Sequence, residues 1–248
     1  RTIDLMKEAG IEMIRDEIYW HLVEQEKGQL RVPEQARRNV EYTVEQGIDL
    51  LLILDYANPH YDNDMAPHTP EGREAFARYC EFMAREFRGE IDYFEIWNEP
   101  NIDGFWKPRA NAEDYAELVK VAYPAVKRGN PEAFVLAGGL SMIDMEFTKK
   151  VMEAGAHDFM DAWSVHPYIT PRSPAEADLW QKLQDVHELV ASYGGAVPIW
   201  VTETGYPTHT GGGVSEHHQA NMLARAYIGS CTVPYNTVYG WYWFGPDG

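Results

Sequence analysis

Short apolar runs and longer stretches with a helical period alternate along the chain. Continuously apolar runs are typical of strands covered on both faces, and Leu50-Leu-Leu-Ile-Leu54 is the clearest of them. Seven runs are predicted to be strands: 11–15, 48–54, 91–97, 134–137, 162–165, 199–202 and 238–243. Several of them end abruptly at polar residues, which predicts that the strand ends carry the chemistry of the molecule.

Helical patterns lie between most of these runs, and their boundaries carry capping signals. The predicted helices are 33–46 before Gly47, 69–89 with Thr69-Pro70 at its start, a helix capped by Asn111, 173–194 with the capping box Ser173 to Glu176, and 215–228. Strand and helix therefore alternate, which indicates an α/β fold and favours a single (β/α)8 barrel, the TIM barrel. A doubly wound sheet is the alternative, but no Gly-x-Gly-x-x-Gly follows a predicted strand.

The element count does not reach eight strands. A helical pattern at 2–9 precedes the first predicted strand, and no helical pattern follows the last. We therefore expect the barrel to lack its first strand and last helix, so that residues 1–248 form one barrel domain trimmed at both ends. A miscounted strand is the other explanation.

Composition narrows the class of partner. A hydrophobic fraction of 45% over 248 residues fits a globular protein with a large core, and the net charge of −18 disfavours nucleic acid and anionic membranes. No run approaches the ~20 apolar residues of a membrane span. A secreted or periplasmic location is favoured over a cytoplasmic one. Two cysteines are too few for a disulfide framework or a four-ligand zinc site, and no cofactor or metal is predicted.

The carboxyl ends of the strands face the active site in a barrel of this kind, so the residues there are the catalytic candidates. These are Arg15, Asp16, Asp55, Tyr56, Asn58, His60, Asn98, Glu99, His166, Tyr168, Glu203, Tyr206, Trp241 and Trp243. Glu99 and Glu203 each follow a predicted strand. A pair of carboxylates in this arrangement is the minimum equipment for cleaving a glycosidic bond.

The segment Trp97-Asn98-Glu99-Pro100 resembles the acid/base motif of the clan A retaining glycoside hydrolases, which share the (β/α)8 barrel. In that clan the Asn-Glu pair ends the fourth strand and the nucleophilic Glu ends the seventh. Glu99 and Glu203 follow the third and sixth predicted strands here. One additional strand at the start would make these the fourth and seventh strands, as in the clan. Family 39 and related bacterial exopolysaccharide-cleaving enzymes are the most similar, on the segments 96–101, 105–106, 137–139, 164–168 and 202–207.

The resemblance implies roles for individual residues. Glu99 would be the acid/base and Glu203 the nucleophile in the hydrolysis of β-glycosidic bonds of an oligo- or polysaccharide by double displacement. Asn98 would bind the sugar 2-hydroxyl. Further contacts with substrate or nucleophile are expected from Arg15, His166, Tyr168, Trp241, Trp243, Trp106 and Tyr56. The sugar, the linkage, endo or exo action and the oligomeric state stay open.

Other readings of the same residues remain. Arg15 could simply neutralise a neighbouring acid, and Trp106 is as well suited to the core as to a sugar platform. A barrel that binds carbohydrate without hydrolysing it is one alternative function. A metal-dependent hydrolase is another, with His60 and His166 as the candidate ligands.

Overall fold

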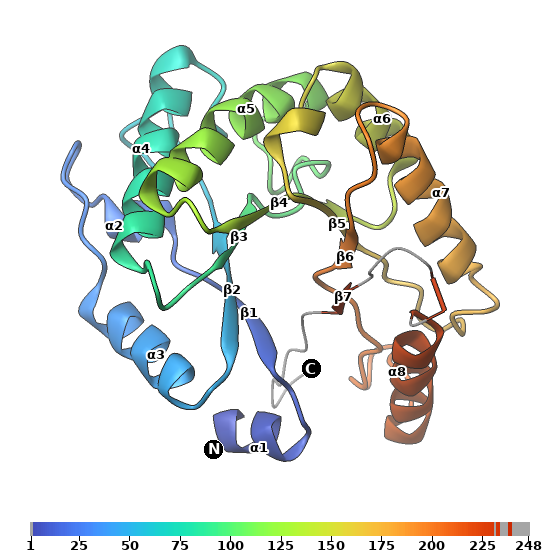
Figure 1. Ribbon diagram of the computed structural model, residues 1–248. Coiled ribbons are helices and arrows are strands. Elements are labelled where there is room, and N and C mark those ends of the chain that lie inside the picture. Colours follow the sequence, from blue (N-terminus) through green and yellow to red (C-terminus); the bar gives the residue numbers. More distant parts are fainter. Residues whose placement is uncertain (1, 231, 234–237, 240–248) are drawn as a thin grey trace.

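The computed structural model describes residues 2–230, 232–233 and 238–239, and these residues form a curled parallel sheet surrounded by helices (Figure 1). The strands follow the chain order and are β1 Met13–Glu17, β2 Asp49–Leu54, β3 Tyr93–Ile96, β4 Phe134–Ser141, β5 Ala162–His166, β6 Ile199–Val201 and β7 Val238–Tyr239. Every neighbouring pair is parallel. Among the described residues, β1 and β7 are the edge strands.

Helices connect successive strands and lie outside the curled sheet (Figure 1). They are α1 Thr2–Glu8, α2 Trp20–Val23, α3 Glu34–Glu45, α4 Pro70–Glu86, α5 Ala112–Gly129, α6 Met145–Glu153, α7 Leu179–Ala191 and α8 Glu216–Ser230, with a short 3-10 helix at His157–Phe159. This arrangement is an incomplete (β/α)8 barrel and confirms the predicted fold class.

The two faces of the sheet contact different cores. Residues at alternate strand positions point into the barrel, where Leu51, Leu136, Ala162 and Trp200 form a closed apolar cluster. The other positions pack against the helices in a much larger cluster, which includes the predicted core residue Cys80. Because the inner cluster fills the base of the barrel, the inward-facing positions nearer the carboxyl ends of the strands are left for polar side chains.

Some predicted boundaries differ from the structure. The first strand begins at Met13 rather than residue 11, since its position is set by pairing of Met13 with Asp49 rather than by its own weak apolar pattern. The Ser173 hydroxyl and the Glu176 carboxylate do hydrogen-bond, at 2.7 Å, but they close a turn. The helix that they were predicted to open begins only at Leu179.

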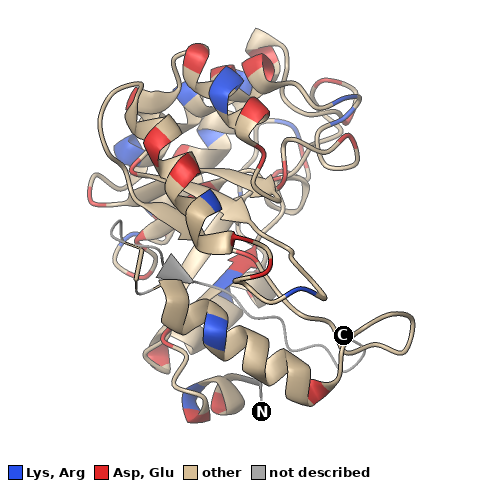
Figure 2. Ribbon diagram, turned by 90° about the vertical axis from the view of Figure 1, so that its right-hand side faces the viewer, with Lys and Arg blue, Asp and Glu red and all other residues tan. Residues whose placement is uncertain are grey.

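Charged residues cover the outer helices in mixed order. In Figure 2, acidic and basic segments are interspersed along the helices. Pairs of opposite charge four residues apart, such as Arg38 with Glu34 and Lys150 with Glu146, occur on the outer helices. None of the helices among the described residues has the length and apolar character needed to cross a membrane.

Candidate active site

Arg15 organises the polar layer above the apolar base of the barrel. It faces inward from β1, and its guanidinium donates three hydrogen bonds: Nε to Glu95 Oε2 at 2.6 Å, Nη2 to Asn98 Oδ1 at 2.8 Å and Nη1 to Glu203 Oε2 at 3.2 Å. These acceptors come from β3, the segment after β3 and the segment after β6. One buried side chain therefore fixes the relative position of the two strand ends that carry the candidate carboxylates.

Glu95 is the fully buried partner of Arg15 in the middle of β3. Its second oxygen, Oε1, accepts hydrogen bonds from the Ser164 hydroxyl at 2.5 Å and the Thr202 hydroxyl at 2.9 Å. Burial alone would raise the pKa of this carboxyl, but the Arg15 charge and the hydrogen bonds outweigh it, so the pKa lies below its usual range. Glu95 is therefore an ionised structural carboxylate.

Glu99 stands at the end of β3 on a backbone that few residues adopt. Its φ is 47°, and that of Trp97 is 69°, both in the left-handed region. The Glu99 amide donates to the carbonyl of Gly139 at 2.9 Å, across to β4. Gly139 itself has a φ of 54°, and an added Cβ would lie 3.2 Å from the Trp97 carbonyl oxygen. The close approach of the Gly138-Gly139 bulge thus positions the Glu99 backbone.

Glu203 follows β6 and lies opposite Glu99. Its Oε2 accepts from Arg15, and its Oε1 accepts a short hydrogen bond from the Tyr168 hydroxyl. Burial, and next the negative charge of Glu203, raise the pKa of Tyr168, so this phenol remains a donor. One carboxylate oxygen of Glu99 and one of Glu203 lie within 4.8 Å of each other. This upper limit fits the ~5–5.5 Å between the carboxyl groups of retaining glycosidases better than the ~6.5–9.5 Å of inverting ones.

His166 at the end of β5 links the two halves of the site. Its Nδ1 lies 3.1 Å from Glu99 Oε1 and 3.7 Å from Glu203 Oε2, and its Nε2 lies 3.1 Å from Thr202 Oγ1. The imidazole is completely buried. His166 therefore bonds only to other protein groups. It can influence a bound sugar through the Glu99 and Glu203 carboxylates but cannot contact it directly.

Asn98 and Tyr56 extend the site toward the loop after β2. The Asn98 amide nitrogen donates to the Tyr56 hydroxyl at 2.7 Å, while its oxygen accepts from Arg15. Both hydrogen-bonding ends of Asn98 are thus held, which fixes the orientation of the amide. Burial, and next the Asp55 charge, raise the pKa of Tyr56 and keep its hydroxyl protonated.

The structure brings together seven of the ten residues to which the resemblance gives a role. Arg15, Tyr56, Asn98, Glu99, His166, Tyr168 and Glu203 form one hydrogen-bonded cluster. The expectation for Trp106 as a substrate contact is wrong, because its indole is only 1% exposed and packs against Trp97 and Tyr115. Trp241 and Trp243 lie outside the described residues.

Three members of the cluster were missed in the sequence: Glu95, Ser164 and Thr202. Glu95 did carry a signal, since it is a single acid inside the apolar run 93–97, and alternation places it on the same face as Tyr93 and Trp97. Ser164 and Thr202 lie in segments that carry the family resemblance, but no role was assigned to them. Small hydroxyl side chains are common in strands, and only the tertiary structure aims them at Glu95.

Glu99, His166 and Glu203 also form the one group of three such side chains in the described part of the chain that could hold a metal ion. The donor set of two carboxylates and an imidazole is chemically suited to a divalent cation. The same three groups have protein partners, however, since Arg15 and Tyr168 already bond to Glu203. The Arg15 guanidinium, so close to the Glu203 carboxylate, opposes metal binding electrostatically.

The model of the family Cellulase (glycosyl hydrolase family 5) matches residues 1–243. Among solved structures, a family 39 glycoside hydrolase from the gut symbiont Bacteroides cellulosilyticus WH2 aligns with a TM-score of 0.83 and 31% identity, over 100% of this chain and 54% of that one. The family 39 enzyme from Xanthomonas axonopodis pv. citri aligns with a TM-score of 0.72 and 14% identity, over 97% and 54%. No curated protein sequence gives a significant match.

A monomeric β-xylosidase from Caulobacter crescentus CB15 aligns with a TM-score of 0.61 and 18% identity, over 82% of this chain and 48% of that one. The two structures with identities below 25% support the fold alone. The chain spans about half the length of these three structures. Since the family model covers nearly the whole chain and the barrel carries paired glutamates at two strand ends, the chain belongs to glycosyl hydrolase family 5 and thus to clan A of the glycoside hydrolases.

Proposed function

We propose that this protein hydrolyses β-glycosidic bonds with retention of configuration, with Glu203 as nucleophile and Glu99 as acid/base. The approach of the two carboxylates to within 4.8 Å carries the proposal, because a retaining enzyme needs direct attack by one carboxylate and leaves no room for a water behind the sugar. Membership of a glycoside hydrolase family supports the reaction class.

The reaction proceeds in two displacements. Glu203 attacks the anomeric carbon while Glu99 gives its proton to the departing glycosidic oxygen, which yields a glycosyl ester on Glu203 and a free alcohol. Glu99, now a carboxylate, takes a proton from water as that water attacks the same carbon. The ester bond then breaks and Glu203 is restored, with the β configuration regenerated.

The hydrogen-bond pattern supports these roles. Glu95 is ionised and accepts the single proton of the Thr202 hydroxyl, so the Thr202 oxygen is left to accept from His166 Nε2. A neutral imidazole that donates from Nε2 has an acceptor at Nδ1, and Nδ1 faces Glu99. In the acid form of Glu99 that the proposed mechanism requires, its O–H would donate to this Nδ1. Glu203, in contrast, faces the donors Arg15 and Tyr168 and suits an ionised carboxylate.

The substrate is proposed to be a β-linked oligo- or polysaccharide. The name of the matching family, Cellulase, concerns a β-linked glycan and supports this substrate class. Asn98, fixed by Arg15 and Tyr56, is placed to bond the 2-hydroxyl of the reactive sugar, a contact that strengthens in the transition state.

A panel of 4-nitrophenyl β-glycosides, followed by ¹H NMR of the first sugar formed, tests the proposal. We expect release of nitrophenol, the β anomer as first product, and equal rates with and without EDTA. An α anomer first would contradict the role of Glu203. Loss of activity in EDTA would instead support a metal at Glu99, His166 and Glu203, and sugar binding without release would indicate a non-catalytic carbohydrate-binding barrel.

A further inference from the structure

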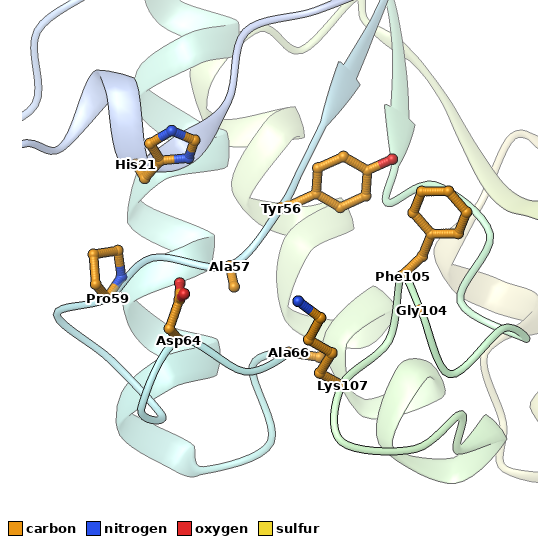
Figure 3. Close-up of a pocket in the computed structure, with 9 residues that line it drawn as sticks. All are labelled: His21, Tyr56, Ala57, Pro59, Asp64, Ala66, Gly104, Phe105 and Lys107. Carbon is orange, nitrogen blue, oxygen red and sulfur yellow. The ribbon is translucent and has the colours of Figure 1, made fainter.

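A pocket opens beside the catalytic cluster, with which it shares Tyr56. It has a volume of about 390 Å³, within the range of small-molecule sites. It is lined by residues of α2, the loop after β2 and the loop after β3: His21, Tyr56, Ala57, Pro59, Asp64, Ala66, Gly104, Phe105 and Lys107 (Figure 3). The Ala66 amide donates to the Lys107 carbonyl at 3.1 Å, which ties the two loops together.

Tyr56 is shared by this pocket and the catalytic cluster. Its ring lines the pocket, and its hydroxyl accepts from Asn98, the residue assigned to the 2-hydroxyl of the reactive sugar. With Asn98 bonded to the 2-hydroxyl as proposed, the pocket adjoins the reactive sugar on the side of its ring carbons 2 and 3. A unit attached at the 3-hydroxyl extends on that side, whereas one attached at the 4-hydroxyl leaves from the part of the ring opposite the anomeric carbon.

One wall of the pocket is aromatic. The Tyr56 and Phe105 rings are stacked, with centroids 5.8 Å apart and planes 20° apart, and they lie next to each other in Figure 3. Phe105 is 40% exposed, although apolar rings of this size are normally covered. An exposed aromatic surface of this kind is suited to the apolar face of a pyranose ring.

The opposite wall offers hydrogen-bonding groups of both charges. Neither the Lys107 ammonium nor the Asp64 carboxylate forms an ion pair with another described residue, although both line the pocket. In Figure 3 the Lys107 side chain extends between Asp64 and Phe105 toward Tyr56. An ammonium that donates and a carboxylate that accepts can together hold neighbouring hydroxyls, and their opposite charges favour a neutral sugar over a charged one.

We propose that this pocket is a subsite for a neutral pyranose attached to the 3-hydroxyl of the reactive sugar, so that the preferred substrate is a 3-linked β-glycan. The assignment rests on the proposed function, because the Asn98 contact defines the direction of the reactive sugar. It predicts that binding energy from the second sugar is used at the transition state, which raises kcat/KM.

The test compares three 4-nitrophenyl β-glycosides in each of the glucose, xylose and mannose series: the monosaccharide, the 3-linked disaccharide and the 4-linked disaccharide. In the series that the wild-type enzyme cleaves, we expect kcat/KM for the 3-linked disaccharide to exceed the monosaccharide value about tenfold or more. Equal values for these two, or a higher value for the 4-linked disaccharide, would overturn the proposal.

Phe105→Ala and Lys107→Ala then locate the effect. Each should lower the ratio of 3-linked disaccharide to monosaccharide kcat/KM several-fold, and Lys150→Ala, an exposed lysine on α6 away from this pocket, should leave the ratio unchanged. A ratio unaffected by both pocket variants, with wild-type circular dichroism spectra, would also overturn the subsite.

Calorimetric titration of the wild-type protein keeps the two proposals separable. If no glycoside is cleaved, the proposed hydrolysis fails, and the 3-linked and 4-linked trisaccharides of the same sugars can still be compared by binding. Tighter binding of a 3-linked trisaccharide that Phe105→Ala weakens would support the subsite even then. No preference for the 3-linked compounds would reject it.

Discussion

The ends of β3 and β6 each carry a glutamate, but the surroundings of the two carboxylates differ. Glu203 receives hydrogen bonds from Arg15 and Tyr168, whereas Glu99 has His166 as its one hydrogen-bond partner among the described side chains. Their side chains are 22% and 10% exposed. Glu203 is thus held by two donors, and Glu99 by a single imidazole.

The largest effects are expected from removing the carboxylates themselves. Glu203→Gln should lower kcat/KM by about 10⁴-fold or more for every glycoside, because no nucleophile remains. Glu99→Gln should cost about 10²–10⁴-fold for poor leaving groups and far less for 2,4-dinitrophenyl glycosides, which need no proton. Initial rates over a series of leaving groups give the comparison. The same leaving-group dependence in both variants would contradict the division of roles.

Among these variants, loss of the Arg15–Glu95 ion pair beneath the ends of β3 and β6 should have the largest effect on stability. Glu95→Gln leaves the buried Arg15 charge without its fully buried carboxylate partner, with only the longer contact to Glu203, and should reduce the free energy of unfolding by about 3–5 kcal/mol. The difference from wild type should be present above pH ~4.5 and shrink as the pH falls through the lowered folded-state pKa of Glu95. Urea unfolding at several pH values measures it.

Glu24→Gln is the matched control for that variant. Glu24 is also a buried carboxylate, but its partners are the neutral donors of Trp20, Tyr61 and Gly28. Its loss leaves no charge unpaired, so the effect on stability should be smaller. An equal loss of stability in the two variants would show that the Arg15–Glu95 ion pair contributes no more than a buried carboxylate with neutral partners.

Removal of one hydrogen bond near each glutamate should give different kinetic effects, because the two glutamates have different roles. Tyr168→Phe removes a donor to Glu203 and should lower kcat/KM about 10–100-fold whatever the leaving group. Thr202→Val removes the acceptor for His166 and should act mainly on poor leaving groups, through Glu99. Brønsted plots of rate against leaving-group pKa distinguish these outcomes.

Two remote residues serve as controls for that pair. Tyr123 donates to Asp161, and Thr148 donates to the Asp144 carbonyl, both on the outer helices. Tyr123→Phe and Thr148→Val should leave kcat/KM unchanged. If Thr202→Val instead affects all leaving groups alike, the hydrogen-bond chain to Glu99 does not set its protonation.

The smallest effect concerns the backbone that holds Glu99. Gly139→Ala places a Cβ 3.2 Å from the Trp97 carbonyl oxygen at a φ of 54°, and it should cost about 1–2 kcal/mol of stability together with some activity. Gly47→Ala is the control, since Gly47 has a φ of 73° but nothing within 4 Å of the added atom. It should lower stability slightly, as thermal unfolding would show, without lowering activity. Equal losses of activity in Gly139→Ala and Gly47→Ala would show that Gly139 has no specific role in positioning Glu99.

The comparison also shows what the sequence could predict. Glu99 and Glu203 were found because parallel strands bring their carboxyl ends together, so order along the chain is enough to place them. Glu95 was missed although its place in an apolar run was visible, because a buried acid is explained only by its partners Arg15, Ser164 and Thr202. Trp106 was assigned wrongly because burial of a loop aromatic depends on distant contacts, here Trp97 and Tyr115.

Azide rescue of Glu99→Ala tests the assignment of the two glutamates most directly. With an activated β-glycoside and sodium azide, Glu203 should still form its glycosyl ester, and azide should enter the space left by Glu99 on the opposite face of the sugar. The account predicts faster turnover and a β-glycosyl azide, identified by ¹H NMR. An α-glycosyl azide would mean that azide replaced the nucleophile, and it would reverse the roles of the β3 and β6 strand ends.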